Sequence, residues 1–213
     1  PLVACLRAPE ALASVFSFRD YQFDWPERIT MDAAIEAERL GAEIRNYTEV
    51  TGLERLQSGG WQASLIDRLD NSSSAKVSAH YLMNLAGVWV DQVNRIASPE
   101  TPPGQKVVAI KGSHIAVRLP AKFRNFGTAG LNREGEHMFC LPWGDLHYIG
   151  PTETVYDGDI EDVRPTKDDI DFLIEETNYM LPGLGVSHND IEFAWAGARP
   201  ITYDPNRAKG KRA

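Results

Sequence analysis

The chain has 213 residues, 43% of them hydrophobic, so it can bury one sizeable core or two modest ones. Its formal net charge of −8 and isoelectric point near 5.1 argue against a nucleic-acid-binding surface, which needs clustered basic residues. It has no apolar run near the ~20 residues of a membrane-spanning helix and no segment with the features of a signal peptide.

The cysteines and histidines give no support for a metal site or a disulfide framework. Cys5 and Cys140 are the only cysteines and lie far apart, which favours a reducing, cytoplasmic location. The five histidines contain no His-x-x-x-His pair, so we expect no bound metal. The basic residues at the C-terminus are expected to form a frayed tail, residues 207–213.

The first half of the chain predicts one helix followed by strands. Apolar residues at helical spacing predict a helix over Trp25–Leu40, with Pro26 in its first turn and Gly41 at its end. The predicted strands and the polar turns between them are, in order, Ile44–Val50, Gly59-Gly60, Trp61–Asp67, Asn71–Ser74 and Val77–Leu85.

The second half predicts a mixed, largely antiparallel sheet with a helix, which is typical of a substrate-binding domain. The proline-rich segment 99–103 is the clearest change in composition and predicts a domain crossing. One helix is expected after Thr166, which can form a capping box with Asp169, and it would end at Pro182-Gly183. The predicted strands are Val107–Ile110, Ser113–Leu119, Met138–Leu141, Leu146–Ile149 and Ile191–Ala198.

The sequence Asn84-Leu85-Ala86-Gly87 would close a strand with a small residue and a glycine. Small residues allow the backbone to approach a flat ring or a pyrophosphate closely. An ordinary strand end that turns at its glycine has the same pattern, so both interpretations are open.

His114 follows Ser113 within an apolar, strand-like segment. An imidazole that titrates near neutral pH can take the proton from a hydroxyl while a hydride leaves the same carbon. The alternative is a structural histidine, satisfied on a half-buried strand.

Arg199 lies between Gly197-Ala198 and Pro200. Its planar guanidinium suits a phosphate or a carboxylate, while glycine gives room before it and proline fixes the chain after it. The alternative is a surface arginine paired with Glu192.

Taken in order, Asn84–Trp89, Lys111–Ile115 and Gly197–Pro200 resemble the central part of FAD-dependent glycerol-3-phosphate dehydrogenases. These enzymes belong to the superfamily of D-amino-acid-oxidase-like FAD-dependent oxidoreductases. Departures from the family pattern are Leu85 in place of a small residue and Phe18 in place of a tyrosine. Weaker matches extend the resemblance from Phe16 to Thr202 and lie at Phe16–Asp20, Glu27–Ile29, Pro142–Gly144 and Gly150–Glu153.

The resemblance implies an α/β (α+β) fold. It implies part of an FAD-binding domain of the two-dinucleotide-fold type, joined to a mixed, largely antiparallel substrate-binding domain. Residues 1–24 would be a strand and lead-in of the substrate domain. Residues 25–98 would form the partial FAD-binding domain, 99–206 the substrate-binding domain and 207–213 the tail.

The resemblance also implies the site and its chemistry. His114 and Arg199 would be catalytic, with His114 either the base or a binding group. FAD would be the cofactor, and the residues expected to contact it are Val50, Ala86, Gly87, Trp89 and Gly197. The substrate would be sn-glycerol 3-phosphate, oxidised to dihydroxyacetone phosphate, with the electrons passed to a quinone.

The partners implied are a homo-oligomer and a peripheral contact at the inner face of the cell membrane, in an otherwise cytoplasmic protein. Two alternatives remain: an amine or 2-hydroxy-acid oxidoreductase of the same superfamily, and a non-catalytic metabolite-binding module. No Gly-x-Gly-x-x-Gly follows a strand, so the loop for the FAD pyrophosphate would precede Pro1. A Gly-Gly-Lys-x-Thr segment of the family would follow Ala213. We therefore expect this chain alone neither to retain FAD tightly nor to turn over.

Overall fold

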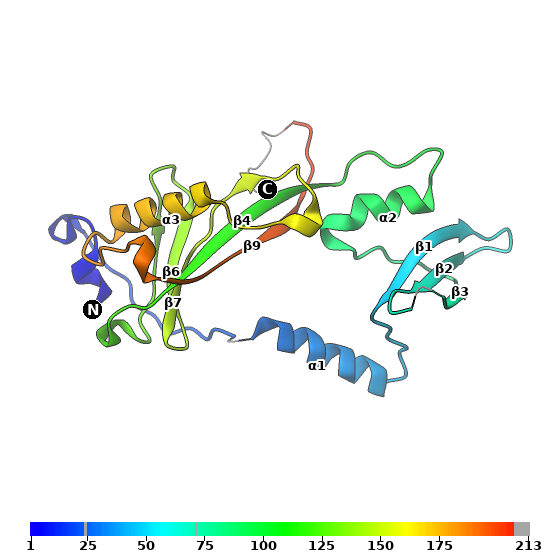
Figure 1. Cartoon of the computed structure of the whole chain (residues 1–213), viewed down its shortest axis with the longest axis horizontal. Helices are drawn as coiled ribbons and strands as arrows, with labels where there is room; N and C mark the ends of the chain where they lie inside the picture. Colours follow the sequence, from blue (N-terminus) through cyan, green and yellow to red (C-terminus); the bar gives the residue numbers. More distant parts are fainter. Residues whose placement is uncertain (24, 71, 207–213) are drawn as a thin grey trace. The chain divides into compact units, whose positions relative to one another are not determined.

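The computed structural model describes residues 1–23, 25–70 and 72–206 (Figure 1). These divide into two compact units, one made of residues 1–23 and 108–206, the other of residues 25–107. Asn71, part of a predicted turn, and the predicted tail 207–213 lie outside the described residues.

The described residues of the 25–107 unit contain two α-helices and a three-stranded antiparallel sheet in the order β1-β2-β3. Helix α1, Pro26–Arg39, begins with Pro26 in its first turn and ends before Gly41, whose φ of +96° favours glycine, so the helix prediction is confirmed. The strands are β1 Thr48–Arg55, β2 Trp61–Asp67 and β3 Ser74–Ala79. The prediction for β2 is confirmed at both ends.

The predictions for the two flanking strands were wrong in their bounds. The strand predicted over Ile44–Val50 begins only at Thr48, because Tyr47 adopts a positive φ of 51° that interrupts extended backbone. The strand predicted over Val77–Leu85 ends at Ala79, which pairs with Trp61, the first residue of β2. Beyond that pair β2 offers no further residue, so residues 80–86 do not extend the strand.

A short helix that the sequence pattern did not predict follows these residues. A single 3-10 turn, Gly87–Trp89, leads directly into α2, Val90–Ala97. The Asn84 side chain stabilises this entry, since its Nδ2 donates to the Val90 carbonyl at 2.9 Å and its Oδ1 accepts from the Ala86 N–H at 3.2 Å. The sequence Asn84–Gly87 therefore precedes a helix and does not close a strand.

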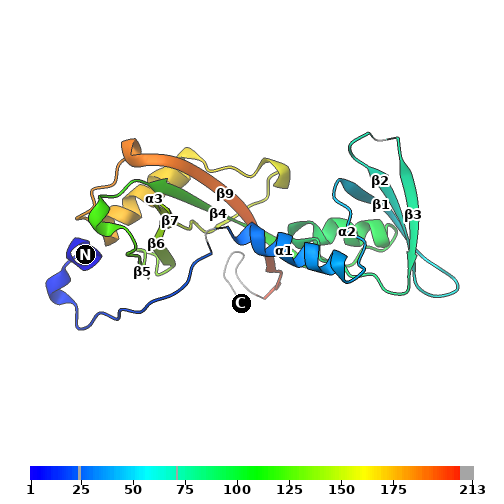
Figure 2. The same ribbon diagram turned by 90° about the horizontal axis from the view of Figure 1, so that it is seen from below.

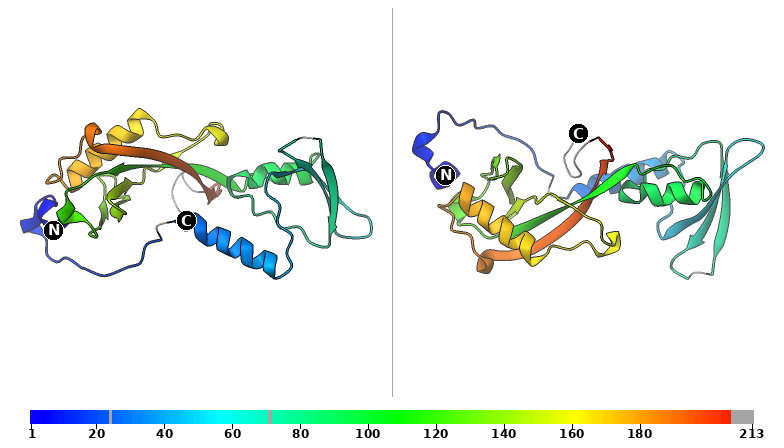
Figure 3. Two further views of the ribbon diagram at one scale, coloured as in Figure 1. Left: turned by 60° about the horizontal axis from the view of Figure 1, so that its bottom comes forward. Right: turned by 90° about the horizontal axis from the view of Figure 1, so that it is seen from above.

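The other unit is built on a six-stranded sheet with the order β5-β6-β7-β4-β8, in which β9 also pairs with β4. Every pair along β5-β6-β7-β4-β8 is antiparallel, which confirms the predicted antiparallel sheet. Strands β4 and β9 run side by side, as Figure 3 shows. The strand bounds are β4 Val107–Val117, β5 Thr128–Leu131, β6 His137–Trp143, β7 Leu146–Gly150, β8 Thr154–Val155 and β9 Ile191–Thr202.

The prediction of two strands, Val107–Ile110 and Ser113–Leu119, was wrong because they form the single strand β4. The glycine between them does not break the strand. Lys111 stays paired with Thr154 of β8 on one side of it, and Ile115 is paired with Ile149 of β7 on the other.

Helix α3, Lys167–Met180, lies along one face of this sheet (Figure 2). The Thr166 hydroxyl accepts from the Asp169 N–H, and the Asp169 carboxylate accepts from the Thr166 N–H, so the predicted capping box is confirmed. Leu173 of α3 is fully buried in a core with Ile115 and Cys140. Burial of one such leucine side chain contributes about 1.5–3 kcal/mol.

The N-terminal segment contributes to the same core but forms no strand. Leu2 and Cys5, in the 3-10 turn Leu2–Cys5, are buried in it, and a second turn covers Pro9–Ala11. The strand expected around Phe16–Asp20 is absent from the described residues. Phe16 is 90% exposed, and residues 12–23 pair with no strand of the described chain.

Both cysteines are free and buried. None of the helices within the described ranges has the length and apolar character needed to cross a bilayer.

Candidate active site

The two faces of β4 have different environments. This difference shows on which face of the strand each candidate residue lies. Lys111 contacts Asp169 of α3, and Ile115 packs in the core with Leu173. Because successive side chains of a strand point to opposite faces, Gly112 and His114 lie on the face away from α3.

His114 is part of an aromatic cluster on that face. Its ring stacks on Trp195 of β9, with ring centroids 5.3 Å apart and an interplanar angle of 8°. Tyr148 of β7 meets it edge-on, with centroids 6.0 Å apart. Trp143 of β6 contacts Trp195, with ring centroids 5.9 Å apart, so the rings of the cluster come from β6, β7 and β9.

The surroundings keep this imidazole neutral. Burial lowers the pKa of His114, and the nearby positive charge of Arg199 lowers it further, to about 4. At neutral pH the ring therefore carries no charge, and one ring nitrogen has a lone pair that can accept a proton.

Arg199 lies against the backbone of β4. A Cβ atom at Gly112 would come within 2.6 Å of the guanidinium carbon of Arg199, so only glycine leaves room for it there. Nη1 of Arg199 lies 3.8 Å from Oε1 of Glu153. The alternative that pairs Arg199 with Glu192 was wrong, because Glu192 pairs with Arg118 at 3.1 Å.

The structure thus brings His114 and Arg199 together on one face of one sheet. Gly197 lies between Trp195 and Arg199 in β9, and a Cβ atom there would meet no heavy atom within 4 Å. The surface over Gly197 is therefore open among the described residues, as a flat ring that approaches the backbone requires.

Gly150 lies next to His114, although in the sequence it stood out only as part of a weaker family match, Gly150–Glu153. A Cβ atom at Gly150 would lie 2.6 Å from Cδ2 of His114 and 2.9 Å from the Ser113 carbonyl oxygen. The imidazole ring occupies that space. The one sequence signal for this contact with His114 is the position of Gly150 at the end of the strand that pairs with β4.

The other expected FAD contacts belong to the unit of residues 25–107. Gly87 has φ +57°, and a Cβ there would meet no heavy atom within 4 Å. Ala86 precedes it, and Trp89 is 40% exposed in the same turn. Val50 is half-buried in β1, next to an irregularity in its pairing with β2. The small residues 86 and 87 fit a site where a nucleotide cofactor approaches the backbone.

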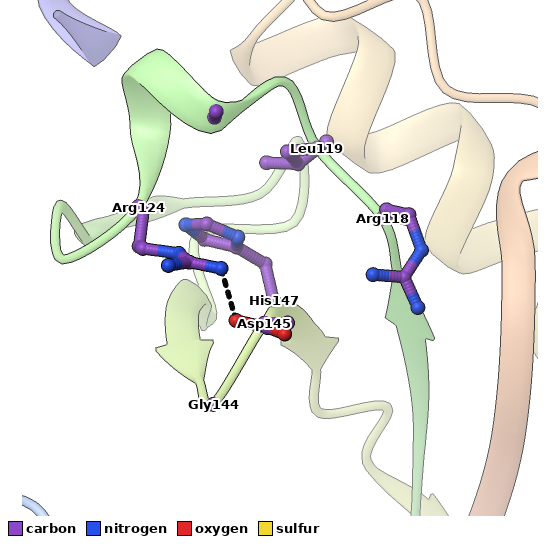
Figure 4. Close-up of a pocket in the computed structure, with 7 residues that line it drawn as sticks. Arg118, Leu119, Arg124, Gly144, Asp145 and His147 are labelled. Carbon is purple, nitrogen blue, oxygen red and sulfur yellow. Dashed lines mark hydrogen bonds and ion pairs between the residues drawn. The ribbon is translucent and has the colours of Figure 1, made fainter.

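A separate hollow of about 230 Å³ lies at the hairpin between β6 and β7 (Figure 4). Its buried His147 has Nε2 3.1 Å from the Phe126 carbonyl oxygen, and burial lowers the pKa of this histidine. Its two arginines are matched by carboxylates, since Arg124 pairs with Asp145 and Arg118 with Glu192. The lining residues are Arg118, Leu119, Ala121, Arg124, Gly144, Asp145 and His147. The hollow includes neither His114 nor Arg199.

Within the part of the chain that the structure describes, no three His, Cys, Asp or Glu side chains are grouped so that they could hold a metal ion.

Comparison with known proteins gives a family match over nearly the whole chain. The family model described as FAD dependent oxidoreductase matches residues 4–211. The glycerol-3-phosphate dehydrogenase of Synechocystis sp. is 30% identical over 204 residues, which are 90% of this chain and 36% of that protein. The aerobic glycerol-3-phosphate dehydrogenase of Bacillus subtilis is 31% identical over 180 residues, 84% of this chain and 32% of the relative.

A solved structure gives the same result. The glycerol-3-phosphate dehydrogenase from Bacillus halodurans, complexed with FAD, superposes with a TM-score of 0.72 at 30% identity. The match covers 83% of this chain and 35% of that chain, and it confirms the predicted mixed α/β fold class. The chain spans about a third of the length of the curated relatives that it matches.

Proposed function

Because the chain belongs to the family of FAD-dependent oxidoreductases, we propose that its protein oxidises sn-glycerol 3-phosphate to dihydroxyacetone phosphate. The observation that carries the proposal is that a guanidinium, Arg199, and a neutral imidazole, His114, lie near each other on one face of the sheet. The names of the similar proteins support this substrate.

Arg199 binds the phosphate of the substrate. A guanidinium offers charge-assisted hydrogen bonds to phosphate oxygens in a planar arrangement. Its position against Gly112 keeps it next to His114. Binding at the anionic end orients the rest of the substrate, which contributes to the rate through positioning.

His114 accepts the proton of the substrate hydroxyl at a ring nitrogen. The ring is neutral before substrate binds, as this role requires. A bound phosphate opposes the field of Arg199 and so raises the pKa of His114, which makes the imidazole a stronger base when substrate is present. The stacked Trp195 holds the ring in place.

The residues proposed to contact FAD are those whose small size or turn geometry leaves the backbone accessible, together with their neighbours: Val50, Ala86, Gly87, Trp89 and Gly197. FAD, when bound, supplies the acceptor for the hydride. Quinone as the final electron acceptor, a homo-oligomer, and a cytoplasmic protein in peripheral contact with the inner face of the membrane are parts of the proposal that rest on the resemblance alone.

A second candidate is an oxidoreductase that acts on an amine or a 2-hydroxy acid. A guanidinium pairs with a carboxylate as well as with a phosphate, and the Glu153 carboxylate at 3.8 Å partly compensates the charge of Arg199, which favours a singly charged anion. This candidate keeps the fold, the cofactor and the role of His114, and it changes only the anionic group that Arg199 binds.

The deciding experiment uses the protein from the complete reading frame, purified with FAD. Dye reduction is followed with glycerol 3-phosphate, sarcosine and 2-hydroxyglutarate. Arg199→Ala is compared with Arg118→Ala, a matched control at an arginine that directly follows β4 and pairs with Glu192. Turnover with glycerol 3-phosphate alone, lost only in Arg199→Ala, is expected. Preference for a carboxylate substrate would replace this proposal by the second candidate, and an inert flavin-free protein would favour a binding module.

The proposal that the 213-residue chain alone does not hold FAD tightly has its own test. The chain is mixed with FAD and passed through a gel-filtration column. We expect the protein peak to show no flavin absorbance, and a co-eluting flavin spectrum would contradict this part of the proposal.

A further inference from the structure

The segment that follows β7 is fixed to β4 by a pair of hydrogen bonds. The Ser113 N–H donates to Oγ1 of Thr152 at 2.8 Å, and the Thr152 N–H donates to the Ser113 carbonyl at 3.1 Å. Both residues are buried, with 0% and 3% of their surfaces exposed. The residue after Thr152 is Glu153, so its position beside β4 is determined by this contact.

Glu153 and Gly112 together form a seat for Arg199. The Glu153 carboxylate, whose side chain is 14% exposed, lies 3.8 Å from the guanidinium. On the β4 side, Gly112 leaves the space that the guanidinium occupies. In this seat, the Glu153 carboxylate attracts the guanidinium from one side, and Gly112 leaves room on the other side for the guanidinium to approach β4 closely.

The seat also sets the charge of the site. Arg199 is positive, Glu153 is a nearby carboxylate and His114 is neutral at neutral pH. Tyr148, the titratable group that β7 places at the imidazole, has its pKa raised by burial and is also neutral. Lys111 and Asp169 lie on the other face of the sheet and pair with each other. An anionic ligand thus meets a guanidinium whose charge is partly compensated.

We propose that Glu153 is a positioning and specificity-determining residue, which holds Arg199 over Gly112 and sets how strongly the site distinguishes doubly from singly charged anions. The inference rests on the proposed role of Arg199 in binding the anionic end of the substrate. A like charge beside the same guanidinium weakens ligand binding by about tenfold per unit of ligand charge. The carboxylate therefore opposes a dianion more strongly than a monoanion.

The positioning part is tested on the 213-residue chain by NMR titration of the His114 ring, assigned with His114→Asn. Gly112→Ala and Glu153→Leu should both displace the guanidinium and so raise the pKa of His114 above its value of about 4. Glu153→Gln keeps an oxygen acceptor for Arg199 and should not raise the pKa. Glu192→Gln, which removes a carboxylate paired with Arg118, is the control. Equal titration of His114 in the wild type, Gly112→Ala and Glu153→Leu would overturn the positioning role. If Glu153→Leu fails to fold, Glu153→Ala, which also removes the oxygen acceptor for Arg199, takes its place with the same expected rise in the pKa of His114.

The specificity part is tested on the FAD-loaded protein from the complete reading frame, with sulfate and acetate as competitive inhibitors. Glu153→Gln should tighten sulfate binding about tenfold more than acetate binding, because sulfate carries one more negative charge. An unchanged ratio of the two inhibition constants would refute this part. If the protein oxidises no glycerol 3-phosphate, the proposed function fails while the titration of His114 still decides whether Glu153 positions Arg199.

Discussion

The buried ion pair between β4 and α3 gives a prediction whose size follows from the structure. Nζ of Lys111 donates to Oδ2 of Asp169 at 2.7 Å, and the two side chains are only 9% and 7% exposed. In Lys111→Met, the Asp169 carboxylate stays buried and keeps only its hydrogen bonds from the Thr166 N–H and hydroxyl, at 2.7 and 2.9 Å. The variant therefore leaves a buried charge without its counter-charge.

The expected cost is about 3 kcal/mol in the free energy of unfolding. Breaking a buried ion pair on one side typically costs about 3–5 kcal/mol, and the two bonds from Thr166 place this case at the lower end. For a protein of this size, such a loss lowers the melting temperature by roughly 6–12 °C. The assay is urea unfolding of the 213-residue chain, followed by tryptophan fluorescence and circular dichroism.

The pH dependence of this cost gives a second check. Burial opposes ionisation of Asp169, but the hydrogen bonds from Lys111 and Thr166 prevail and hold its pKa below the ordinary value of 3.8. A carboxyl group with a lowered folded-state pKa stabilises the fold above the ordinary pKa, and this contribution is lost as the pH falls through the lowered value. The difference between wild type and Lys111→Met should therefore shrink below about pH 4.

The matched control is the double variant Lys111→Met with Asp169→Leu, which removes both charges and should recover part of the stability. A cost under about 1 kcal/mol for Lys111→Met, or a cost that stays constant down to about pH 3, would refute the reasoning.

Four further outcomes are expected. His114→Gln should lower kcat by about 10²–10⁴-fold in steady-state assays, because it removes the proton acceptor. The kcat/KM of the wild type should fall as the pH drops through the pKa of His114, about 4. In Arg199→Gln, the pKa of the His114 ring, measured by NMR titration, should rise because the variant removes a charge that lowers it, and an unchanged pKa would contradict the proximity of the two side chains. Gly150→Ala should abolish activity, since its Cβ would overlap the His114 ring, while Gly104→Ala, where a Cβ would meet no heavy atom within 4 Å and φ is not positive, should retain it. Thr166→Ala should cost about 1 kcal/mol in urea unfolding through loss of the helix cap, and an unchanged midpoint would count against the capping box.

Local rules predicted those elements whose cause is local. The capping box of Thr166 and Asp169 fixes the start of α3 within four residues of sequence. The strand Trp61–Asp67 is bounded on one side by two glycines with positive φ, Gly59 and Gly60, so its start was visible in the sequence.

The wrong strand predictions concern residues whose structure depends on pairing with other strands, and the hydrophobic pattern of the sequence does not contain that pairing. Residues 80–85 are apolar enough for a strand, but β2 has no residue left to pair with them after Trp61. Gly112 suggested a break, whereas the pairing of Lys111 with Thr154 keeps β4 continuous across it. Sequence spacing could not indicate these contacts, because they join segments 18 or more residues apart.

The residues of the candidate site likewise fall into those that the sequence indicated and those whose contacts it could not indicate. The order of motifs pointed to His114 and Arg199, and the structure places them together. Their catalytic roles and the proposed contacts to FAD remain predictions. The contact of Arg199 with Glu153 could not be predicted from spacing, because it depends on the hydrogen bonds between Ser113 and Thr152, 39 residues apart.

The positions of the two cysteines provide a chemical reporter for one unit only. Cys5 and Cys140 are the only thiols of the chain, and both are buried in the core of the unit that carries His114. Burial raises the pKa of Cys140 to about 12, so hardly any reactive thiolate exists at neutral pH while this core is closed. Alkylation of Cys140 must then wait for the core to open, and its rate measures the free energy of that opening. Residues 25–107 contain no cysteine, so thiol labelling reports the stability of the sheet that carries His114.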